Sequence, residues 1–116
     1  MTSMTAPDHP TDEPVAVDLR SIELVDVMRA LADPVRLRIA QVLLPGEAVA
    51  RSKTDWDCDL SRATMSHHFR VLRDAGLIYA WASGRTQLVQ LRVDDITKHV
   101  PGLLQLLARD ATTDLH

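Results

Sequence analysis

The sequence has little of what disulfide-bonded, secreted or membrane-spanning proteins need. Cys58 is the only cysteine among 116 residues, so no internal disulfide can form. No apolar run approaches the ~20 residues that cross a bilayer, because Arg, Asp or Pro interrupts each candidate. The first residues have neither the basic start nor the apolar stretch of a signal peptide. We therefore expect a soluble, cytoplasmic protein with no membrane partner.

Motifs of catalysis are missing too. The sequence contains no glycine-rich phosphate loop, no closely spaced pair of metal-binding histidines, and no Ser or Cys in a nucleophile elbow. We therefore expect that the protein is not an enzyme.

The net charge of -3 conceals a strong segregation of charge along the chain. The first 18 residues carry four carboxylates and no basic side chain. Residues 62–92, in contrast, carry Asp74 as their one carboxylate and several arginines: Arg62, Arg70, Arg73, Arg85 and Arg92. An anionic partner is expected to dock on this middle part of the chain.

The composition predicts one folded domain, since 46% of the residues are hydrophobic. Residues 1–17 have few large apolar groups and are expected to form a flexible acidic arm. The folded domain is expected over residues 18–110, followed by a polar tail over 111–116.

Apolar spacing and capping residues predict helices in the first half of that domain. A first helix is expected from a cap at Asp18, and a second from Asp33-Pro34 to about Leu44. A short helix or helical turn is expected within residues 47–59. Apolar positions of these first two helices recur at helical spacing: Ile22, Val25, Met28, Leu31, Leu37, Ala40, Val42, Leu43 and Leu44.

A clearer helix follows, with Ser61 as its cap and Gly76 as its end. Its expected inner face consists of Met65, Phe69 and Leu72, flanked by His68 and Ala75. We interpret His68 as a hydrogen-bonded structural residue and His67 as an outward one. The outer face is basic and rich in hydrogen-bonding groups: Arg62, Ser66, Arg70 and Arg73, with Ala63 and His67 beside them.

The last third of the domain is expected to form a two-stranded hairpin and a final helix. Strand-like residues flank a Ser83-Gly84-Arg85 turn. Asp94 or Asp95 is expected to cap the final helix, which Pro101-Gly102 should kink or split. The predicted fold is mainly α with a small β-hairpin, in the order α-α-α-α-β-β-α.

Two segments resemble the ArsR/SmtB family of bacterial winged-helix regulators. They are ALADPVRLRI, from Ala30 to Ile39, and LSRATMSHHFRVLRDAGL, from Leu60 to Leu77. Gly84 and Arg85 fall where the wing turn of that family would be. The resemblance covers roughly residues 18–108.

The resemblance implies a winged helix-turn-helix fold and a transcriptional regulator that binds a palindromic operator in double-stranded DNA as a homodimer. The residues that would contact DNA are Ser61, Arg62, Ala63, Thr64, Ser66, His67, Arg70 and Arg85. The first and last helices would form the dimer through Ile22, Val25, Leu103, Leu104 and Leu107. The alternative hypothesis is a winged-helix module that acts through a protein partner or co-regulator without specific DNA contact.

Family members often respond to metal ions, but the ligand sets of the family are incomplete here. Cys58 is a single sulfur, and we interpret it first as a packed apolar residue. Asp95 fits the first place of the site on the last helix, but Thr97, Ala108 and Ala111 occupy the others. If a metal acts as effector, Ni or Zn is expected at the remaining donors: His99, Asp110, Asp114 and His116.

Overall fold

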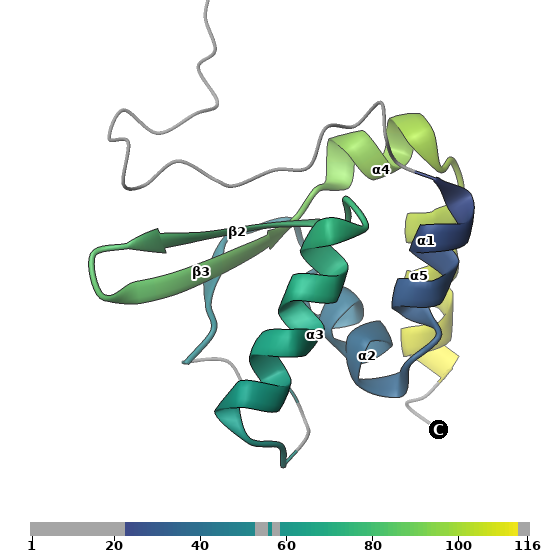
Figure 1. The fold of residues 1–116 in the computed structure, drawn as a ribbon. Coiled ribbons are helices and arrows are strands. Elements are labelled where there is room, and N and C mark those ends of the chain that lie inside the picture. Colours follow the sequence, from purple (N-terminus) through teal and green to yellow (C-terminus); the bar gives the residue numbers. More distant parts are fainter. Residues whose placement is uncertain (1–22, 53–55, 57–58, 114–116) are drawn as a thin grey trace, which may run out of the picture.

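A computed structural model describes residues 23–52, 56 and 59–113 and shows helices packed beside a small antiparallel sheet (Figure 1). This arrangement confirms the predicted winged-helix fold class. The predicted arm over residues 1–17 and the helix cap at Asp18 lie outside the described residues. At the other end, the last helix extends to Thr113 and so enters the predicted polar tail.

Two short helices begin the described chain. Helix α1 (Leu24–Leu31) follows Glu23, whose side chain makes no capping hydrogen bond. Helix α2 (Pro34–Val42) begins as predicted, because the Asp33 carboxylate accepts from the amides of Val35 and Arg36 at 2.9 and 3.1 Å. It ends two residues before the expected Leu44.

The segment after α2 corrects the sequence-based expectation of a helical turn. Val49–Ala50 instead forms a short strand, β1, which pairs with Val89 and Leu88. This pairing joins β1 to the hairpin in a three-stranded sheet of order β1-β3-β2. The hairpin therefore has a third strand, β1, along the edge formed by β3. Arg51 directly follows β1 in the chain, so this pairing holds Arg51 beside the hairpin.

Helix α3 (Arg62–Asp74) has the predicted bounds to within one residue. Ser61 caps its start, and a Schellman motif ends it, with Gly76 donating to the Arg73 carbonyl and Leu77 to the Leu72 carbonyl. Gly76 has a φ of 86°, which a residue with a side chain rarely adopts. The helix therefore ends where the chain must turn into the hairpin.

The hairpin consists of β2 (Ile78–Ser83) and β3 (Thr86–Leu91), joined by the two-residue loop Gly84-Arg85. Glycine at the first position of such a loop, here with a φ of 63°, is typical of a type II′ turn. Figure 1 shows that the hairpin, the wing of the fold, projects away from the helices.

The final helix is split, as Pro101-Gly102 predicted. Helix α4 (Val93–His99) and helix α5 (Leu103–Thr113) are separated by Val100 and these two residues. The predicted cap is wrong, because Arg92 occupies the cap position and Asp94 and Asp95 lie in the first turn of α4.

The core lies between the helices and the inner side of the sheet. It includes the predicted Phe69 and Leu72 of α3, together with Val27 of α1 and Val89 of β3. In α2 and the residues that follow it, the sequence interpretation omitted Ile39, which is fully buried, while Leu37, Val42 and Leu44 are only partly buried.

Candidate nucleic-acid interface

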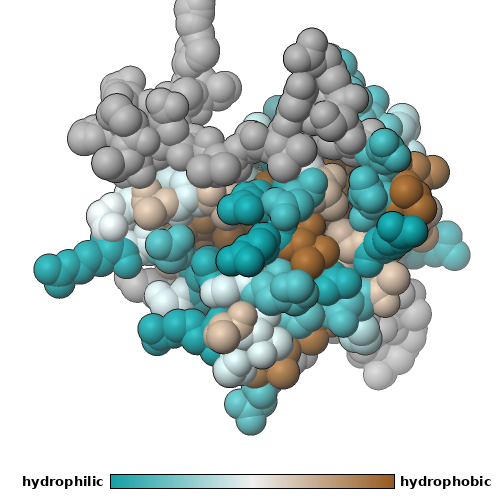
Figure 2. All heavy atoms as spheres, in the orientation of Figure 1, coloured by the Kyte–Doolittle hydropathy of each residue, from teal (hydrophilic) through white to brown (hydrophobic). Residues whose placement is uncertain are grey.

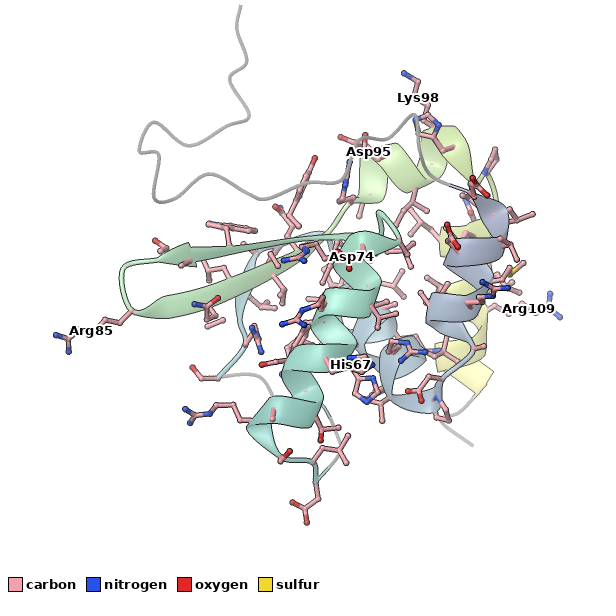
Figure 3. All side chains as sticks on the ribbon, viewed as in Figure 1. His67, Asp74, Arg85, Asp95, Lys98 and Arg109 are labelled. Carbon is pink, nitrogen blue, oxygen red and sulfur yellow. The ribbon has the colours of Figure 1, made fainter. Side chains whose placement is uncertain are left out.

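The outer face of α3 is exposed and offers cations and hydrogen-bonding groups. The predicted contact residues with exposed positions on this face and its cap are Ser61, Arg62, Ala63, Thr64, His67 and Arg70. Arg85 is also exposed and projects from the tip of the wing (Figure 3). Ser66 differs from the others because it is half-buried.

Ser61 and Thr64 form a hydrogen-bonded pair at the start of α3. The Ser61 hydroxyl accepts from the Thr64 amide at 3.1 Å and donates to Thr64 Oγ1 at 2.9 Å. The Thr64 hydroxyl keeps its own proton for an outside acceptor. This end of the helix also carries the positive end of the helix dipole, which favours an anion.

Arg51 is the site residue that the sequence interpretation missed. Its Nη2 donates to Ser66 Oγ at 2.7 Å, which joins the chain after β1 to α3. Its guanidinium carbon lies 4.5 Å from the centre of the Phe69 ring. Burial lowers the pKa of the Arg51 guanidinium from its ordinary value, but arginine remains charged near neutral pH.

Aromatic side chains form the support beneath Arg51. The rings of Trp56 and Phe69 meet edge to face, with centroids 5.2 Å apart. Trp56 Nε1 donates to the Arg51 carbonyl at 3.0 Å. The Arg51 amide donates to the Gln87 carbonyl of β3 at 2.9 Å. Arg51 is thus held by contacts from the sheet, from α3 and from Trp56.

A groove of about 630 Å³ separates the start of α3 from the wing. Its described lining includes three arginines, Arg51, Arg62 and Arg85, and no carboxylate. The remaining lining residues form an apolar floor with polar neighbours: Ser52, Trp56, Leu60, Met65, Ser66, Phe69 and Gln87. A groove with these arginines suits a polyanion that contacts both α3 and the wing.

Two of the five arginines predicted to form a basic surface have partners elsewhere. Arg73 forms an ion pair with Asp74, with Nη2 and Oδ1 3.1 Å apart. Arg92 is 3% exposed and its Nε donates to Asp95 Oδ2 at 3.1 Å. The basic surface is therefore smaller than the sequence suggested, and it is concentrated around the groove.

Asp95, which matches the first metal-binding place of the family, is held by other groups. Besides Arg92, the Tyr79 hydroxyl donates to Asp95 Oδ2 at 3.3 Å. Burial raises the pKa of the Tyr79 phenol, and the charge of Asp95 raises it further. The residues around Asp95 thus make a hydrogen-bonded link between the sheet and α4.

The predicted metal ligands are only partly described. His99 is exposed at the end of α4, the side chain of Asp110 is not described, and Asp114 and His116 lie outside the described residues, as does Cys58. Within the described ranges, no three His, Cys, Asp or Glu side chains are grouped so as to hold a metal ion.

The predicted dimer residues occupy different environments. Leu103 and Leu107 are 7% and 3% exposed and belong to the core of one protomer, and Leu104 packs against that core. Val25 is half exposed, and Ile22 lies outside the described residues. Figure 2 shows hydrophobic surface over α1, where Leu24 and Met28 are also more than half exposed.

None of the helices in the described part of the chain is long and apolar enough to span a membrane.

A helix-turn-helix domain family matches residues 31–78, which include α2, α3 and β1.

Sequence relatives of this chain are transcriptional regulators. The uncharacterized HTH-type transcriptional regulator YceK of Bacillus subtilis is 34% identical over 82 residues, which cover 70% of this chain and 82% of the relative. The HTH-type transcriptional regulator CmtR of Mycobacterium tuberculosis is 32% identical over 95 residues, covering 78% of this chain and 75% of CmtR.

Two solved structures share the fold. Rv0081 of M. tuberculosis has a TM-score of 0.56 at 23% identity and covers 79% of this chain and 92% of its own. An ArsR family transcriptional regulator, RHA00566, has a TM-score of 0.55 at 21% identity, with coverage of 87% and 95%. The motifs, the fold and the sequence relatives agree, and the chain belongs to the ArsR family of winged helix-turn-helix transcriptional regulators.

Proposed function

We propose that this regulator binds a palindromic operator as a homodimer, with α3 in the major groove and the wing beside it. The observation that carries the proposal is the groove between α3 and the wing, where Arg62 and Arg85 face a common space without a carboxylate in its described lining. Exposed Thr64 and Arg70 on α3 provide further hydrogen-bonding groups for base edges and phosphates. The expected compartment is the cytoplasm, where bacterial DNA lies.

The homodimer is supported by exposed apolar side chains on the side of the molecule away from the wing. Leu24, Val25 and Met28 of α1 and Leu106 of α5 are each half or more exposed, and Figure 1 places both helices on that side. A second copy that covers these residues would point its own α3 at the same DNA duplex. Two-fold symmetry then requires two half-sites about one helical turn apart, ~34 Å between centres.

The test of operator binding uses the full-length protein and duplex DNA from upstream of its own gene. Binding measured by fluorescence anisotropy should weaken steeply between 50 and 200 mM salt, because binding releases counterions from phosphates. Affinity should exceed that for a shuffled duplex of equal length by about a thousandfold or more. Equal affinity for both duplexes, or binding that does not depend on salt, would favour the alternative role as a protein-interaction module with a co-regulator.

A response to Ni or Zn is a separate hypothesis, and it is based on His99, Asp110, Asp114 and His116. The described donors do not form the family's last-helix site, because Asp95 is bound to Arg92 and Tyr79 and Thr97 stands in the next place. Calorimetric titration of each metal into the intact chain and into a chain ending at Ala108 tests the remaining set. Tight binding that is lost on truncation supports it, and no tight binding to the intact chain rejects it.

A further inference from the structure

The contact between Arg51 and Ser66 lies at a junction that bound DNA would have to approach. Arg51 follows β1, Ser66 belongs to α3, and both line the groove that opens toward the wing. We propose that Arg51 and Ser66 act as one phosphate-binding unit, which holds a single backbone phosphate of DNA between the recognition helix α3 and the wing. This inference rests on the proposed function and adds to its interface a residue that lies outside both α3 and the wing hairpin.

Arg51 is positioned before any ligand arrives. Its backbone is fixed by hydrogen bonds to Gln87 and from Trp56, and its guanidinium lies over the Phe69 ring. Holding an arginine in place reduces the side-chain entropy that binding would otherwise remove. A planar guanidinium has five N–H donors, so the donation to Ser66 leaves others to be directed at a phosphate in a forked geometry.

The same contact sets the direction of the Ser66 hydroxyl. Because Ser66 Oγ accepts from the cationic Nη2 at 2.7 Å, its lone pair faces Arg51 and its own proton points away from the guanidinium. Arg51 and Ser66 therefore present donors together. Donors placed side by side in this way suit the oxygens of a phosphate.

Charge around the pair favours the same ligand. Arg62 and Arg85 line the groove as well, and no carboxylate occurs among the described lining residues. The described part of the groove thus offers three cationic side chains to a phosphate, although the whole chain has a net charge of -3. A phosphate at Arg51 would lie between the contacts made by Arg62 on α3 and those made by Arg85 on the wing.

The test compares three variants by DNA affinity as a function of salt. Arg51→Gln removes the charge and shortens the side chain. Arg51→Lys keeps the charge but loses the forked guanidinium. Ser66→Ala removes the hydroxyl. Lys98→Ala, on α4 and far from Arg85, is the control for loss of one positive charge (Figure 3). Circular dichroism and thermal unfolding establish that each variant is folded before its affinity is compared.

We expect Arg51→Gln to weaken operator binding about tenfold to a hundredfold, as for loss of a charged hydrogen bond. The slope of log affinity against log salt should become shallower by about 0.9, the value for one phosphate contact. Arg51→Lys should keep the wild-type slope with weaker binding. Ser66→Ala should weaken binding without changing the slope, and its effect should be smaller in the Arg51→Gln background than in the wild type.

Three results would overturn the inference while the wild type still binds its operator. One is an Arg51→Gln variant with wild-type affinity and slope. Another is weaker binding with an unchanged slope, which would mean that Arg51 only supports the position of α3. A slope change of equal size in Lys98→Ala would also overturn it. Absence of operator binding by the wild type would instead reject the proposed function itself.

Discussion

Arg36 of α2 donates through Nη1 to Nδ1 of His68 on α3, across 3.2 Å. The same guanidinium donates through Nε to the Ala30 carbonyl at 2.7 Å, at the end of α1. Because an arginine cannot accept, His68 Nδ1 is the acceptor and the ring carries its proton on Nε2. The predicted structural role of His68 is confirmed, since the residue is 9% exposed and hydrogen-bonded. One guanidinium thus connects the first three helices.

Loss of this acceptor should destabilise the protein. In His68→Leu, Arg36 Nη1 loses its partner at a poorly hydrated position, which is expected to cost about 1 to 3 kcal/mol of unfolding free energy. His68→Asn has the same number of side-chain heavy atoms as the leucine variant, branched at the same carbon, and keeps an acceptor near the position of Nδ1. Urea unfolding of both should give a higher stability for the Asn variant. Equal stabilities would mean that the hydrogen bond contributes nothing beyond packing.

The cap at Asp33 should make stability depend on pH. Burial alone would raise the pKa of this carboxyl, but hydrogen bonds from the amides of Arg36 and Val35 and the nearby charge of Arg36 lower it below 3.8. The unfolded state therefore binds the proton more readily. The stabilisation is present above pH ~3.8 and is lost as the pH falls through the lower, folded-state pKa.

Asp33→Asn is the matched variant for that test, because asparagine also caps helices but does not titrate. The wild type should be more stable than Asp33→Asn at pH 7, and the difference should shrink as the pH falls from about 5 to 2. Asp33→Ala should lose about 1 kcal/mol at pH 7 through loss of the cap. A difference between wild type and Asn variant that stays constant with pH would contradict the lowered pKa.

Replacement of Arg62 by Ala should weaken operator binding without affecting the fold, because this side chain is exposed in the first turn of α3. A contact to a base edge is worth about 1 to 3 kcal/mol of discrimination. The loss of affinity in Arg62→Ala should be greater for the operator than for a shuffled duplex, as measured by competition between the two duplexes for the protein. Equal losses for both duplexes would assign Arg62 to the phosphate backbone instead.

Arg85→Ala should act differently from Arg62→Ala. The Arg85 side chain projects from the tip of the wing, where a phosphate contact would carry no base information. Affinity should fall for operator and shuffled DNA alike, and the salt slope should become shallower by about one unit. Arg85→Lys should restore the slope. If Arg85→Ala keeps the wild-type slope, the wing tip does not contact phosphate.

Two leucines of α5 allow the proposed dimer interface and the core of the protomer to be tested separately. Leu106→Asp places a charge on an exposed position and should convert the dimer to a folded monomer, which sedimentation velocity would detect. Leu103→Asp places the same charge inside the protomer and should unfold it. An unaltered dimer in Leu106→Asp would remove this residue from the interface.

Local signals in the sequence were sufficient to predict the helices α2 and α3. Asp33 with Pro34, and Ser61 with Gly76, mark helix ends through groups that lie within a few residues of each other. The inner face of α3 could also be predicted, because a helix of this length repeats its apolar positions several times. These signals were enough to identify the exposed face that carries Arg62 and Arg70.

The features that could not be predicted from the sequence depend on contacts between distant parts of the chain. A strand of two residues shows no alternation, and the partners of Val49 and Ala50 lie on β3, far along the sequence. Without β1, nothing in the sequence places Arg51 beside Ser66. The partners of Asp95 were hidden for a similar reason, because Tyr79 reaches it from β2.

The uneven pairing of β3 gives the wing a gradient of local stability. Val89 and Leu88 are paired with strands on both sides, whereas Ser83 and Thr86 next to the tip pair only with each other. Amide protons near the tip should therefore exchange with solvent through small openings that leave the core intact. Arg85 therefore lies in the part of the hairpin with the lowest expected local stability, although it is the part that projects furthest from the helices.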